Sequence, residues 1–420
     1  MRAEIISIGT ELLLGQITDT NAADLGVLLA NIGVDHTNRQ TVGDHHDRAV
    51  EAIKLALTRS DVVFTIGGLG PTPDDLTRQA IADALEDTLV RDESLVEHLN
   101  EQYGKRGLKM SESQFNQADR PTCGVPIPNA NGTAPGLYCQ KNDKHLFSLP
   151  GPKNEFNPMI NGPVKEILES LRPGYPIYSR TFRVCGISEA SIGEQLADLM
   201  ASPDPTLAPY AKIGEVHLRA STRAETKRIA EAKLDFIADE VKNRLGSAVY
   251  AEGDESLEAW IIKSLTAKNQ TIATAESCTG GLLAARLTSI DGSSKVFGTG
   301  YVTYSAESKH NRLGVKEWTL LQHGTVSEET AKEMALGARG RTGSHYGISI
   351  TGVAGEDPLN EPPKPKPSGL IYIGIASPKS VEVHKLNLRG DRQTIRDRTV
   401  SFALIKFRDL LLNQTPTLKV

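Results

Sequence analysis

The stretch DVVFTIGGLGPTPDDLTRQAIADALE, residues 61–86, decides the fold of the first part of the chain. Its apolar, β-branched start (61–68) predicts a buried strand, a glycine-rich turn follows, and residues 74–86 have the spacing of an amphipathic helix. The same alternation is repeated upstream, with strands predicted over 3–9 and 34–43 and helices over 19–33 and 44–60. Such alternation is typical of a parallel sheet that is covered by helices on both faces.

The turn of this motif offers a place for an anion. Gly67, Gly68 and Gly70 permit positive φ and a close approach of the backbone to a ligand. Backbone N–H groups at the start of the next helix suit a phosphate, and ligands of parallel sheets bind at the carboxyl ends of the strands. No G-x-x-x-x-G-K-[ST] motif is present, so the turn is not a Walker P-loop.

Asp74 and Asp75 stand at the predicted helix start, and two interpretations are open. One carboxylate could cap the helix, but both would not be needed for that. The other would then be available to hold a metal or to act as a base. A magnesium-type cation prefers one or two carboxylates together with ligand phosphates.

The bulk composition limits the class of protein. The chain has 420 residues, so two or three domains are expected, and 39% hydrophobic with 24% charged residues indicates a globular fold. A net charge of −5 and 5% aromatic residues disfavour a sequence-independent nucleic-acid binder. We therefore expect no direct nucleic-acid partner.

The four cysteines contain no C-x-x-C pair, which disfavours a zinc ribbon or a redox motif and fits free thiols in a reducing compartment. The N-terminus has no signal-peptide pattern, and no apolar run approaches the roughly 20 residues that span a bilayer. We expect a cytoplasmic enzyme with no membrane partner.

Two boundaries divide the chain into predicted domains of residues 1–175, 176–250 and 251–420. The middle domain reads as a small α+β unit: a strand near 178, a helix over 188–200, a Pro-rich loop, a strand over 214–222 and a helix over about 224–245. An RNA-binding KH domain needs a GxxG loop, which residues 178–250 lack, and their charges balance. A structural or dimerisation module is the favoured interpretation.

The last domain contains TAESCTGGLL, residues 274–283, between a predicted strand (270–276) and a helix from about 279. Ser277, Cys278 and Thr279 are three candidate nucleophiles. A nucleophile on such a strand–turn–helix is exposed, and nearby N–H groups can form an oxyanion hole. The alternative is that a hydroxyl caps the helix and that Cys278 is a small packed hydrophobe.

A serine hydroxyl needs an activating base. His310 and His323 exist but have no distinctive context, whereas Tyr304 and Lys309 form a polar pair beside a strand. A buried lysine can serve as the base of a serine. Strand packing for Tyr304 and a solvated charge for Lys309 remain the alternative, and a thiolate of Cys278 remains a second candidate nucleophile.

The chain resembles the CinA (competence/damage-inducible) family over its full length. In the first domain the resemblance rests on GTELLLGQITDTNAADL, GGLGPTPDDLT, NGTAPG and LPGPKNEF. It implies a molybdopterin-binding-like, three-layer parallel-sheet domain with metal-dependent ADP-ribose pyrophosphatase activity. Asp74 and Asp75 would then bind Mg, Mn or Co beside the diphosphate, with Gly67 to Gly70 as its cradle. Further candidates for the same pocket are Glu11, Asn21, Asn131, Thr133 and Glu155.

In the last domain the resemblance is to the nicotinamide-nucleotide amidase domain of that family, and it rests on AESCTGGLLAARLT, GTGYVTYSAESKHNRLGV, HGTVSEETAKEMA and ISITGVAG. It implies hydrolysis of nicotinamide mononucleotide without a metal. Ser277 would be the nucleophile, Lys309 the base and Tyr304 its polar partner. The expected substrate contacts are N–H groups at Thr279, Gly280 and Gly281, the pocket walls Thr351 and Gly352, and Arg392 for the phosphate.

The family resemblance also implies a KH-like fold for the middle domain and a homodimer. The chain departs from the family in a longer, Pro-rich segment over 356–369, with Ser368 where valine is usual, which affects substrate fit more than chemistry. Two other functions stay open: an adaptor for DNA-uptake or recombination proteins, and a first domain that binds a pterin-like ligand without hydrolysing it.

Overall fold

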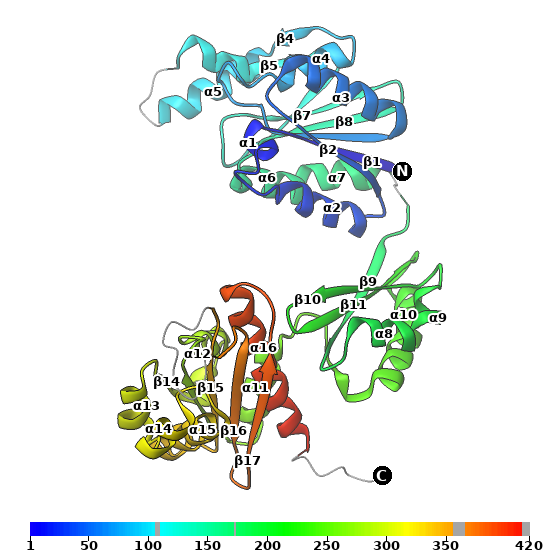
Figure 1. The fold of residues 1–420 in the computed structure, drawn as a ribbon. Coiled ribbons are helices and arrows are strands. Elements are labelled where there is room, and N and C mark those ends of the chain that lie inside the picture. Colours follow the sequence, from blue (N-terminus) through cyan, green and yellow to red (C-terminus); the bar gives the residue numbers. More distant parts are fainter. Residues whose placement is uncertain (106–109, 172–173, 356–365, 414–420) are drawn as a thin grey trace. The chain divides into compact units, whose positions relative to one another are not determined.

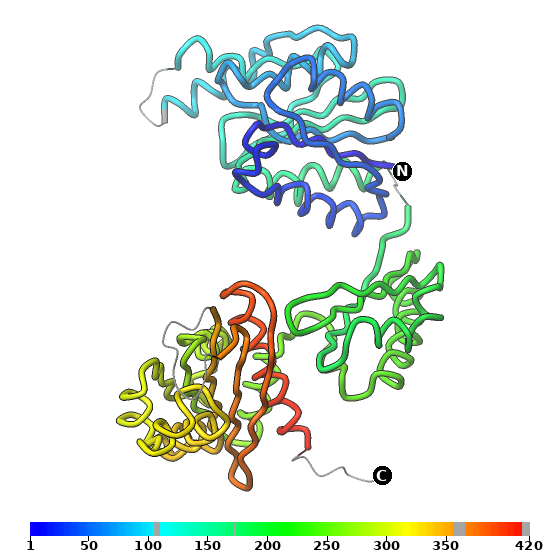
Figure 2. Tube along the Cα trace, viewed as in Figure 1, coloured from blue at the N-terminus to red at the C-terminus, as the bar shows by residue number. Residues whose placement is uncertain are grey.

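The computed structural model describes residues 1–105, 110–171, 174–355 and 366–413. Residues 172–173, just before the predicted boundary between 175 and 176, and residues 356–365 of the Pro-rich segment 356–369 lie outside the described residues. Contacts divide the chain into two units, Met1–Tyr178 with Thr222–Lys233 and Ser179–Ser221 with Leu234–Val420. Figure 2 traces the chain by colour from one end to the other.

The N-terminal domain is built on a six-stranded sheet (Figure 1). In spatial order its strands are β2 (Asp35–Val42), β1 (Arg2–Ile8), β3 (Val62–Ile66), β8 (Lys144–Leu149), β7 (Gly136–Lys141) and β6 (Gly124–Ile127). The pairs among the first four are parallel, as predicted, and the β8–β7 and β7–β6 pairs are antiparallel. The sheet is therefore mixed. A short ladder joins β4 (Leu89–Arg91) to β5 (Asp119–Pro121).

Helices cover both faces of this sheet. Alternate strand residues face opposite ways, so Ile5 packs in one apolar cluster and Ile6 in the other. The first cluster includes α2 (Asn21–Asn31), α6 (Lys153–Met159), the π-turn Ile160–Val164 and α7 (Lys165–Ser170), and the second includes α3 (His46–Arg59) and α4 (Thr77–Ala84). The remaining helices are α1 (Thr10–Leu13), α5 (Glu93–Lys105) and the 3₁₀ helix Glu112–Ala118.

The middle domain has a four-stranded sheet in the order β10 (Thr206–Lys212), β11 (Glu215–Arg223), β9 (Ile177–Cys185) and β12 (Val249–Glu252). Its helices are α8 (Glu189–Gln195), α9 (Ala197–Met200), α10 (Lys227–Leu245) and the 3₁₀ turn Gly246–Ala248. The predicted Pro-rich loop is wrong where β10 forms. Pro209 is tolerated because β10 lies at the edge of the sheet.

The C-terminal domain has a five-stranded sheet in the order β14 (Phe297–Val302), β13 (Ile272–Glu276), β15 (Tyr346–Gly352), β16 (Leu370–Ala376) and β17 (Val381–Asn387). The first three strands are parallel and the last two are antiparallel to their neighbours. The helices are α11 (Leu257–Ala267), α12 (Leu282–Thr288), the 3₁₀ turn Ser293–Lys295, α13 (Ala306–Leu313), α14 (Glu317–His323), α15 (Glu328–Thr342) and α16 (Arg392–Asn413).

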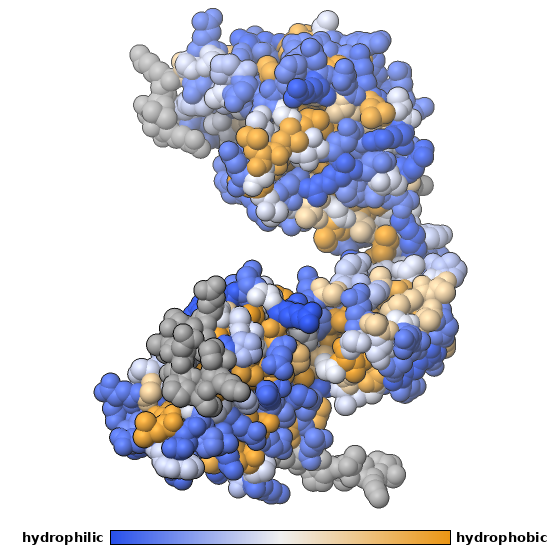
Figure 3. Space-filling model, viewed as in Figure 1, coloured by the Kyte–Doolittle hydropathy of each residue, from blue (hydrophilic) through white to orange (hydrophobic). Residues whose placement is uncertain are grey.

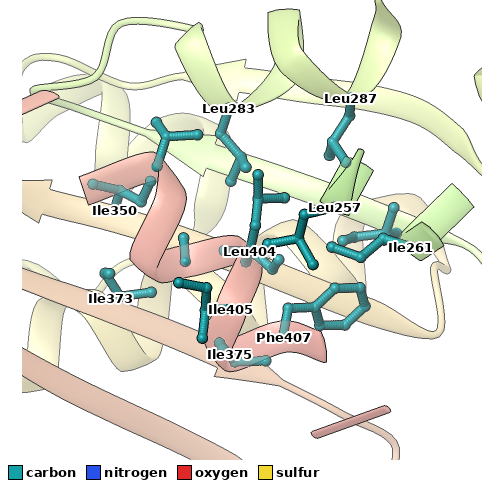
Figure 4. Packing of buried hydrophobic residues seen from close by; sticks show 14 of the residues in the cluster. Leu257, Ile261, Leu283, Leu287, Ile350, Ile373, Ile375, Leu404, Ile405 and Phe407 are labelled. Atoms are coloured by element: carbon teal, nitrogen blue, oxygen red, sulfur yellow. The ribbon is translucent and has the colours of Figure 1, made fainter. Parts of the chain in front are cut away.

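The larger core of this domain lies between the sheet and helices α11, α12 and α16 (Figure 4). Leu283 and Leu404 from the helices and Ile350 and Ile373 from the strands are all fully buried. On the opposite face, Ala273 and Ala275 of β13 pack with Met334 of α15. β13 is thus buried on both faces, and Ser277 follows directly at its carboxyl end.

None of the helices in the described ranges is long and apolar enough to cross a membrane.

Candidate active sites

The C-terminal site is centred on Ser277, the first residue after β13. Its Oγ lies 3.1 Å from the Nζ of Lys309, which comes from α13. Lys309 has no exposed surface, and its Nζ also donates to the carbonyl of Thr303 at 2.9 Å and to that of Tyr304 at 3.3 Å. Two candidate residues separated by 32 positions in sequence are therefore brought into hydrogen-bond contact inside the protein.

The side chain of Tyr304 lies elsewhere. It is 61% exposed, and its hydroxyl accepts a hydrogen bond from Nη2 of Arg392 at 3.0 Å. The expected polar contact with Lys309 is thus made by the backbone carbonyl of Tyr304. The phenol and the exposed guanidinium together form a polar pair at the surface of the site.

The turn after Ser277 is organised by Glu276, which sequence reasoning missed. Its buried carboxylate accepts from the N–H groups of Gly281 (3.1 Å), Leu283 (3.0 Å) and Ala284 (2.8 Å). An acid favours a helix N-terminus because it balances the unpaired N–H groups there. A carboxylate four positions before a Gly-Gly pair that leads into a helix was the available signal.

These bonds correct the predicted oxyanion hole. The Gly281 N–H is bound to Glu276, and the Gly280 N–H donates to the carbonyl of Ser277 at 2.9 Å. The N–H groups of Cys278 and Thr279 remain, because we find no carbonyl or carboxylate acceptor for them in the ranges that the structure covers. The helix itself begins at Leu282, later than predicted, since Gly281 adopts a φ of +96°.

Arg396 is a second missed residue. Its Nη2 donates to the Thr279 carbonyl at 2.8 Å, so it fixes the turn that carries the nucleophile. It follows Arg392 by one helical turn on α16, and the i, i+4 spacing of the two arginines was the signal in the sequence. This end of α16 presents two guanidinium groups to the site.

Thr351 and Gly352, the predicted pocket walls, are engaged in packing. The buried Thr351 hydroxyl donates to the Thr325 carbonyl at 2.7 Å. A Cβ on Gly352 would lie 2.7 Å from the carbonyl oxygen of Leu370, so this glycine is required by the backbone of the neighbouring strand β16. Both residues lie at the end of β15, next to Ser277, whose N–H donates to the Ile350 carbonyl at 2.9 Å.

Cys278 is a packed neighbour in this geometry. It is 6% exposed and belongs to the core cluster of the domain. Burial raises the pKa of its thiol to about 11, so the reactive thiolate is scarce at neutral pH. The position agrees with the alternative in which Cys278 is a small hydrophobe.

The N-terminal candidates surround a cavity of about 680 Å³. It is formed by the loops after β1, β3 and β8, at the carboxyl ends of parallel strands. The lining includes Glu11, Asn21, Gly67, Gly68, Gly70, Asp74, Asp75, Thr133 and Glu155. Asn131 is not among the lining residues, and its amide donates instead to the Asn154 carbonyl at 2.8 Å.

The glycines of the turn are required mainly by their protein neighbours. Gly67 and Gly68 have positive φ as predicted, and a Cβ on Gly68 would lie 2.2 Å from Oγ1 of Thr77. That hydroxyl donates to the Gly67 carbonyl at 2.8 Å. Gly70 does not adopt positive φ, but a Cβ there would lie 2.4 Å from Oδ2 of Asp75.

The capping interpretation of Asp74 and Asp75 is wrong. Helix α4 begins at Thr77 and shows no side-chain cap. Oδ2 of Asp75 accepts from the N–H of Thr72 at 2.8 Å and from its hydroxyl at 2.6 Å. A hydrogen bond from Thr72 also holds the pKa of Asp74 below its usual value. Both carboxylates face the cavity in a turn that precedes the helix.

Asp19 and Asp44 line the same cavity and were missed. Burial raises the pKa of Asp19, but hydrogen bonds from the Ala22 N–H, the Ser7 hydroxyl and Arg39 outweigh it and keep the pKa low. No group of three or more His, Cys, Asp or Glu side chains within the described chain is arranged to hold a metal by itself. The donor set fits a cation that takes one or two carboxylates and completes its shell with phosphate oxygens.

Apolar side chains lie beside this polar cavity. Leu13, Leu14 and Ile17 are 50%, 67% and 55% exposed, and Ile17 also lines the cavity. Figure 3 shows apolar surface on the N-terminal domain where Figure 1 draws α1. A rim of this kind suits a ligand that has both charged and flat apolar parts.

Three family models match the chain in succession: "Probable molybdopterin binding domain" over residues 4–170, "Damage-inducible protein CinA KH domain" over 179–251, and "CinA C-terminal domain" over 254–411. A "Putative competence-damage inducible protein" of Clostridium novyi is 42% identical over 415 residues, which are 99% of both chains. A "CinA-like protein" of Kosmotoga olearia is 43% identical over 98% of this chain and 99% of its own length.

Among solved structures, protein CinA "with unknown function" from Thermoplasma acidophilum is 34% identical, with a TM-score of 0.38, and covers 40% of this chain and 99% of its own. A competence/damage-inducible protein from Agrobacterium tumefaciens is 38% identical, with a TM-score of 0.35, and covers 38% of this chain and 95% of its own.

The fold and the three family models define a multidomain α/β protein with a molybdopterin-binding-like first domain, a KH-like middle domain and a C-terminal α/β domain. The chain belongs to the CinA family.

Proposed function

We propose that the C-terminal domain hydrolyses nicotinamide mononucleotide to nicotinic acid mononucleotide and ammonia. The observation that carries this proposal is the contact between the buried Nζ of Lys309 and Oγ of Ser277, 3.1 Å apart. A nucleophile with a base in hydrogen-bond reach is the requirement for covalent amide hydrolysis. Burial favours the neutral form of an amine, which is the form that accepts a proton.

In the proposed reaction, neutral Lys309 takes the proton of the Ser277 hydroxyl while Oγ bonds to the carboxamide carbon. The carbonyl oxygen becomes an oxyanion, and the N–H groups of Cys278 and Thr279 are the donors for it. Lys309 then returns the proton to the amide nitrogen, the C–N bond breaks and ammonia leaves. Water attacks the acyl-enzyme, with Lys309 again as base, and releases the acid and Ser277.

Arg392 and Tyr304 are the proposed contacts for the 5′-phosphate. A guanidinium binds phosphate oxygens in a fork, and the Tyr304 hydroxyl holds Nη2 of Arg392 from one side. Thr351 and Gly352 remain the proposed walls of the nucleotide pocket.

The test is ammonia release from nicotinamide mononucleotide. Ser277→Ala and Lys309→Met should each lower kcat by about 10³-fold or more, because nucleophile and base act as a unit. Cys278→Ala is the matched control and should keep most of the activity. A dead Cys278→Ala with an active Ser277→Ala would contradict the assignment of the nucleophile. An inactive wild type would favour the adaptor function.

We further propose that the N-terminal cavity hydrolyses ADP-ribose to AMP and ribose 5-phosphate with a divalent metal. The supporting observation is the cavity of about 680 Å³ that gathers the glycine turn and the carboxylates Asp74, Asp75 and Glu11. When bound, Mg, Mn or Co would neutralise the diphosphate and polarise its P–O bonds. Asp74 and Asp75 would hold the metal, and the backbone of Gly67 to Gly70 would orient the diphosphate.

Release of AMP from ADP-ribose in the presence of each metal tests this proposal. Asp74→Asn should lower the rate by about 100-fold or more, because a metal-binding carboxylate is lost. Asp75→Asn should lower it as well and should also loosen the turn at Thr72. Glu51→Gln, an exposed acid on α3, is the control. Binding of a pterin without any hydrolysis of ADP-ribose would favour the non-hydrolytic alternative.

Further expectations stay proposals: domains over 1–175, 176–250 and 251–420, a homodimer, and a cytoplasmic location.

A further inference from the structure

The N-terminal cavity contains one polar side chain that its protein surroundings do not satisfy. Gln117, from the 3₁₀ helix Glu112–Ala118, lines the cavity and is 1% exposed. Both Nε2 and Oε1 of its carboxamide are buried, and neither has a hydrogen-bond partner within the described chain. Leaving a buried amide unpaired is costly, so these two atoms call for a partner.

The chemistry of the carboxamide limits that partner. Nε2 is a donor and Oε1 is an acceptor. A phosphate or a carboxylate offers acceptors only, so it could satisfy Nε2 but would leave Oε1 unpaired. A ring edge with an N–H donor next to an acceptor satisfies both atoms at once, and an adenine edge is the usual match for a glutamine side chain.

A contrast within the same domain supports this reading. Arg78 is also buried, and its Nε and Nη2 have no partner among the described residues, but Arg78 does not line the cavity. Its Nη1 already donates to the Leu69 carbonyl at 2.7 Å. Gln117 therefore differs in forming part of the cavity wall.

We propose that Gln117 is a specificity-determining residue of the N-terminal cavity, which reads the donor–acceptor edge of a heteroaromatic ring in the ligand. The ring is the adenine of an adenine nucleotide, and a pterin has a comparable edge in its lactam N–H and C=O groups. The choice of an adenine nucleotide rests on the proposed N-terminal function. The role of the carboxamide rests on its burial and its unpaired atoms.

The experiment measures binding rather than turnover, so it is separate from the test of hydrolysis. Isothermal titration with AMP would compare wild type, Gln117→Met, which keeps the length but removes both polar atoms, and Gln117→Glu, which removes the donor. The Kd should rise about 10-fold or more in both variants, as expected for the loss of a bidentate contact. Asn116→Ala, an exposed amide on the same helix, is the matched control and should leave the Kd unchanged.

A change in the ligand provides a second measurement, and its comparison in the wild type does not depend on folding of a variant. Purine riboside 5′-monophosphate lacks the 6-amino donor of AMP. It should bind wild type about 10-fold more weakly than AMP does, and Gln117→Met should change its Kd much less than that of AMP.

The possible outcomes distinguish an adenine nucleotide from a pterin as the ligand. A Gln117-dependent Kd for 6-hydroxymethylpterin, with AMP indifferent to the substitution, would support the carboxamide as ring reader and assign the ring to a pterin. Equal Kd values for wild type and Gln117→Met with both ring compounds would overturn the proposal, and so would a wild type that binds neither. If ADP-ribose binds in a Gln117-dependent manner but is not hydrolysed, only the proposed hydrolysis fails.

Discussion

The two candidate sites share the same local arrangement of strand, turn and helix but differ in which of their groups are already bound within the protein. In each, a strand buried on both faces, β13 or β3, runs into a glycine turn with positive φ and then into a helix. In the C-terminal turn the N–H groups are bound by the Glu276 carboxylate, and the proposed nucleophile already touches its base. In the N-terminal turn the glycines pack against Ile8 and Thr77, and the carboxylates face an open cavity.

The comparison shows which groups of each site the protein holds in place before a ligand binds. Covalent catalysis gains from a nucleophile and a base that are held in place before the substrate arrives. A diphosphate site with a metal is completed by the phosphate oxygens of its ligand, so its carboxylates can stay solvated until then. We expect substitutions to act mainly through geometry in the first site and through ligand binding in the second.

Outside the proposed nucleophile and base, the largest effect should come from Glu276→Gln. Gln presents an amide N–H₂ where a carboxylate accepted three N–H groups, so buried charge-assisted bonds are lost. We expect a loss of about 2–4 kcal/mol in the stability of the C-terminal domain. The amidase rate should fall about 100-fold because Ser277 is no longer held in position.

Calorimetry of the full chain, together with ammonia release, measures both consequences. Glu328→Gln, an exposed acid in the first turn of α15, is the control and should change neither. Full amidase activity in a Glu276→Gln variant with a lowered unfolding temperature would show that the carboxylate stabilises the domain without positioning the nucleophile.

Gly68→Ala tests how tightly the N-terminal glycine turn is packed, and Gly15→Ala is its control. Gly68 and Gly15 have nearly equal φ values, +67° and +69°, but a Cβ on Gly68 would lie 2.2 Å from Oγ1 of Thr77, whereas Gly15 has open space. Gly15→Ala should cost about 1 kcal/mol from backbone strain alone. Gly68→Ala should cost about 2–3 kcal/mol, because Thr77 must also move. Equal unfolding temperatures for the two variants would show that the contact yields without cost.

Much of the fold was predictable because apolar periodicity reports burial. The strands over 3–9 and 61–68 and the helices over 19–33 and 44–60 are confirmed with small shifts at their ends. β10 was missed because its Pro209 reads as a loop unless the strand is known to lie at an edge. That position in the sheet is set by tertiary pairing.

The residue types of the candidate sites were also readable, but their contacts were not. The residue types offered Ser277 and Lys309 as candidates and the family resemblance selected them. Neither could show that the Tyr304 phenol pairs with Arg392 while its carbonyl faces Lys309. The roles of Glu276 and Gln117 depend on which backbone N–H groups and which cavity they meet in three dimensions. Local sequence carries no direct record of such long-range contacts.

A smaller effect should follow from Tyr304→Phe. The substitution removes the hydroxyl that accepts from Arg392 but keeps the ring. If Arg392 binds the phosphate, the KM for nicotinamide mononucleotide should rise about 3- to 10-fold with little change in kcat, because ground-state and transition-state binding are lost together. A matching fall in kcat with an unchanged KM would place the phenol in the chemical step instead.

The smallest effect should be at Cys278. Because burial raises the pKa of its thiol to about 11, thiolate forms in quantity only as the pH rises towards that value. Alkylation of Cys278 by iodoacetamide at pH 8 should be at least about 100-fold slower than that of a free thiol. Mass spectrometry of the labelled chain measures this rate. Rapid labelling at pH 8 would reopen the case for a thiolate nucleophile.

The hydrogen bonds that Glu276 accepts at the start of α12 also limit the number of residues between β13 and this helix. One residue ends β13 and, through its carboxylate, marks where the next helix can begin, so the five residues from Ser277 to Gly281 form a spacer of set length. Inserting or deleting a single residue in this spacer would separate the carboxylate from its N–H groups even if every side chain were kept. We therefore expect relatives with a working site to keep Ser277 and the number of residues in this segment, even where other residue types differ.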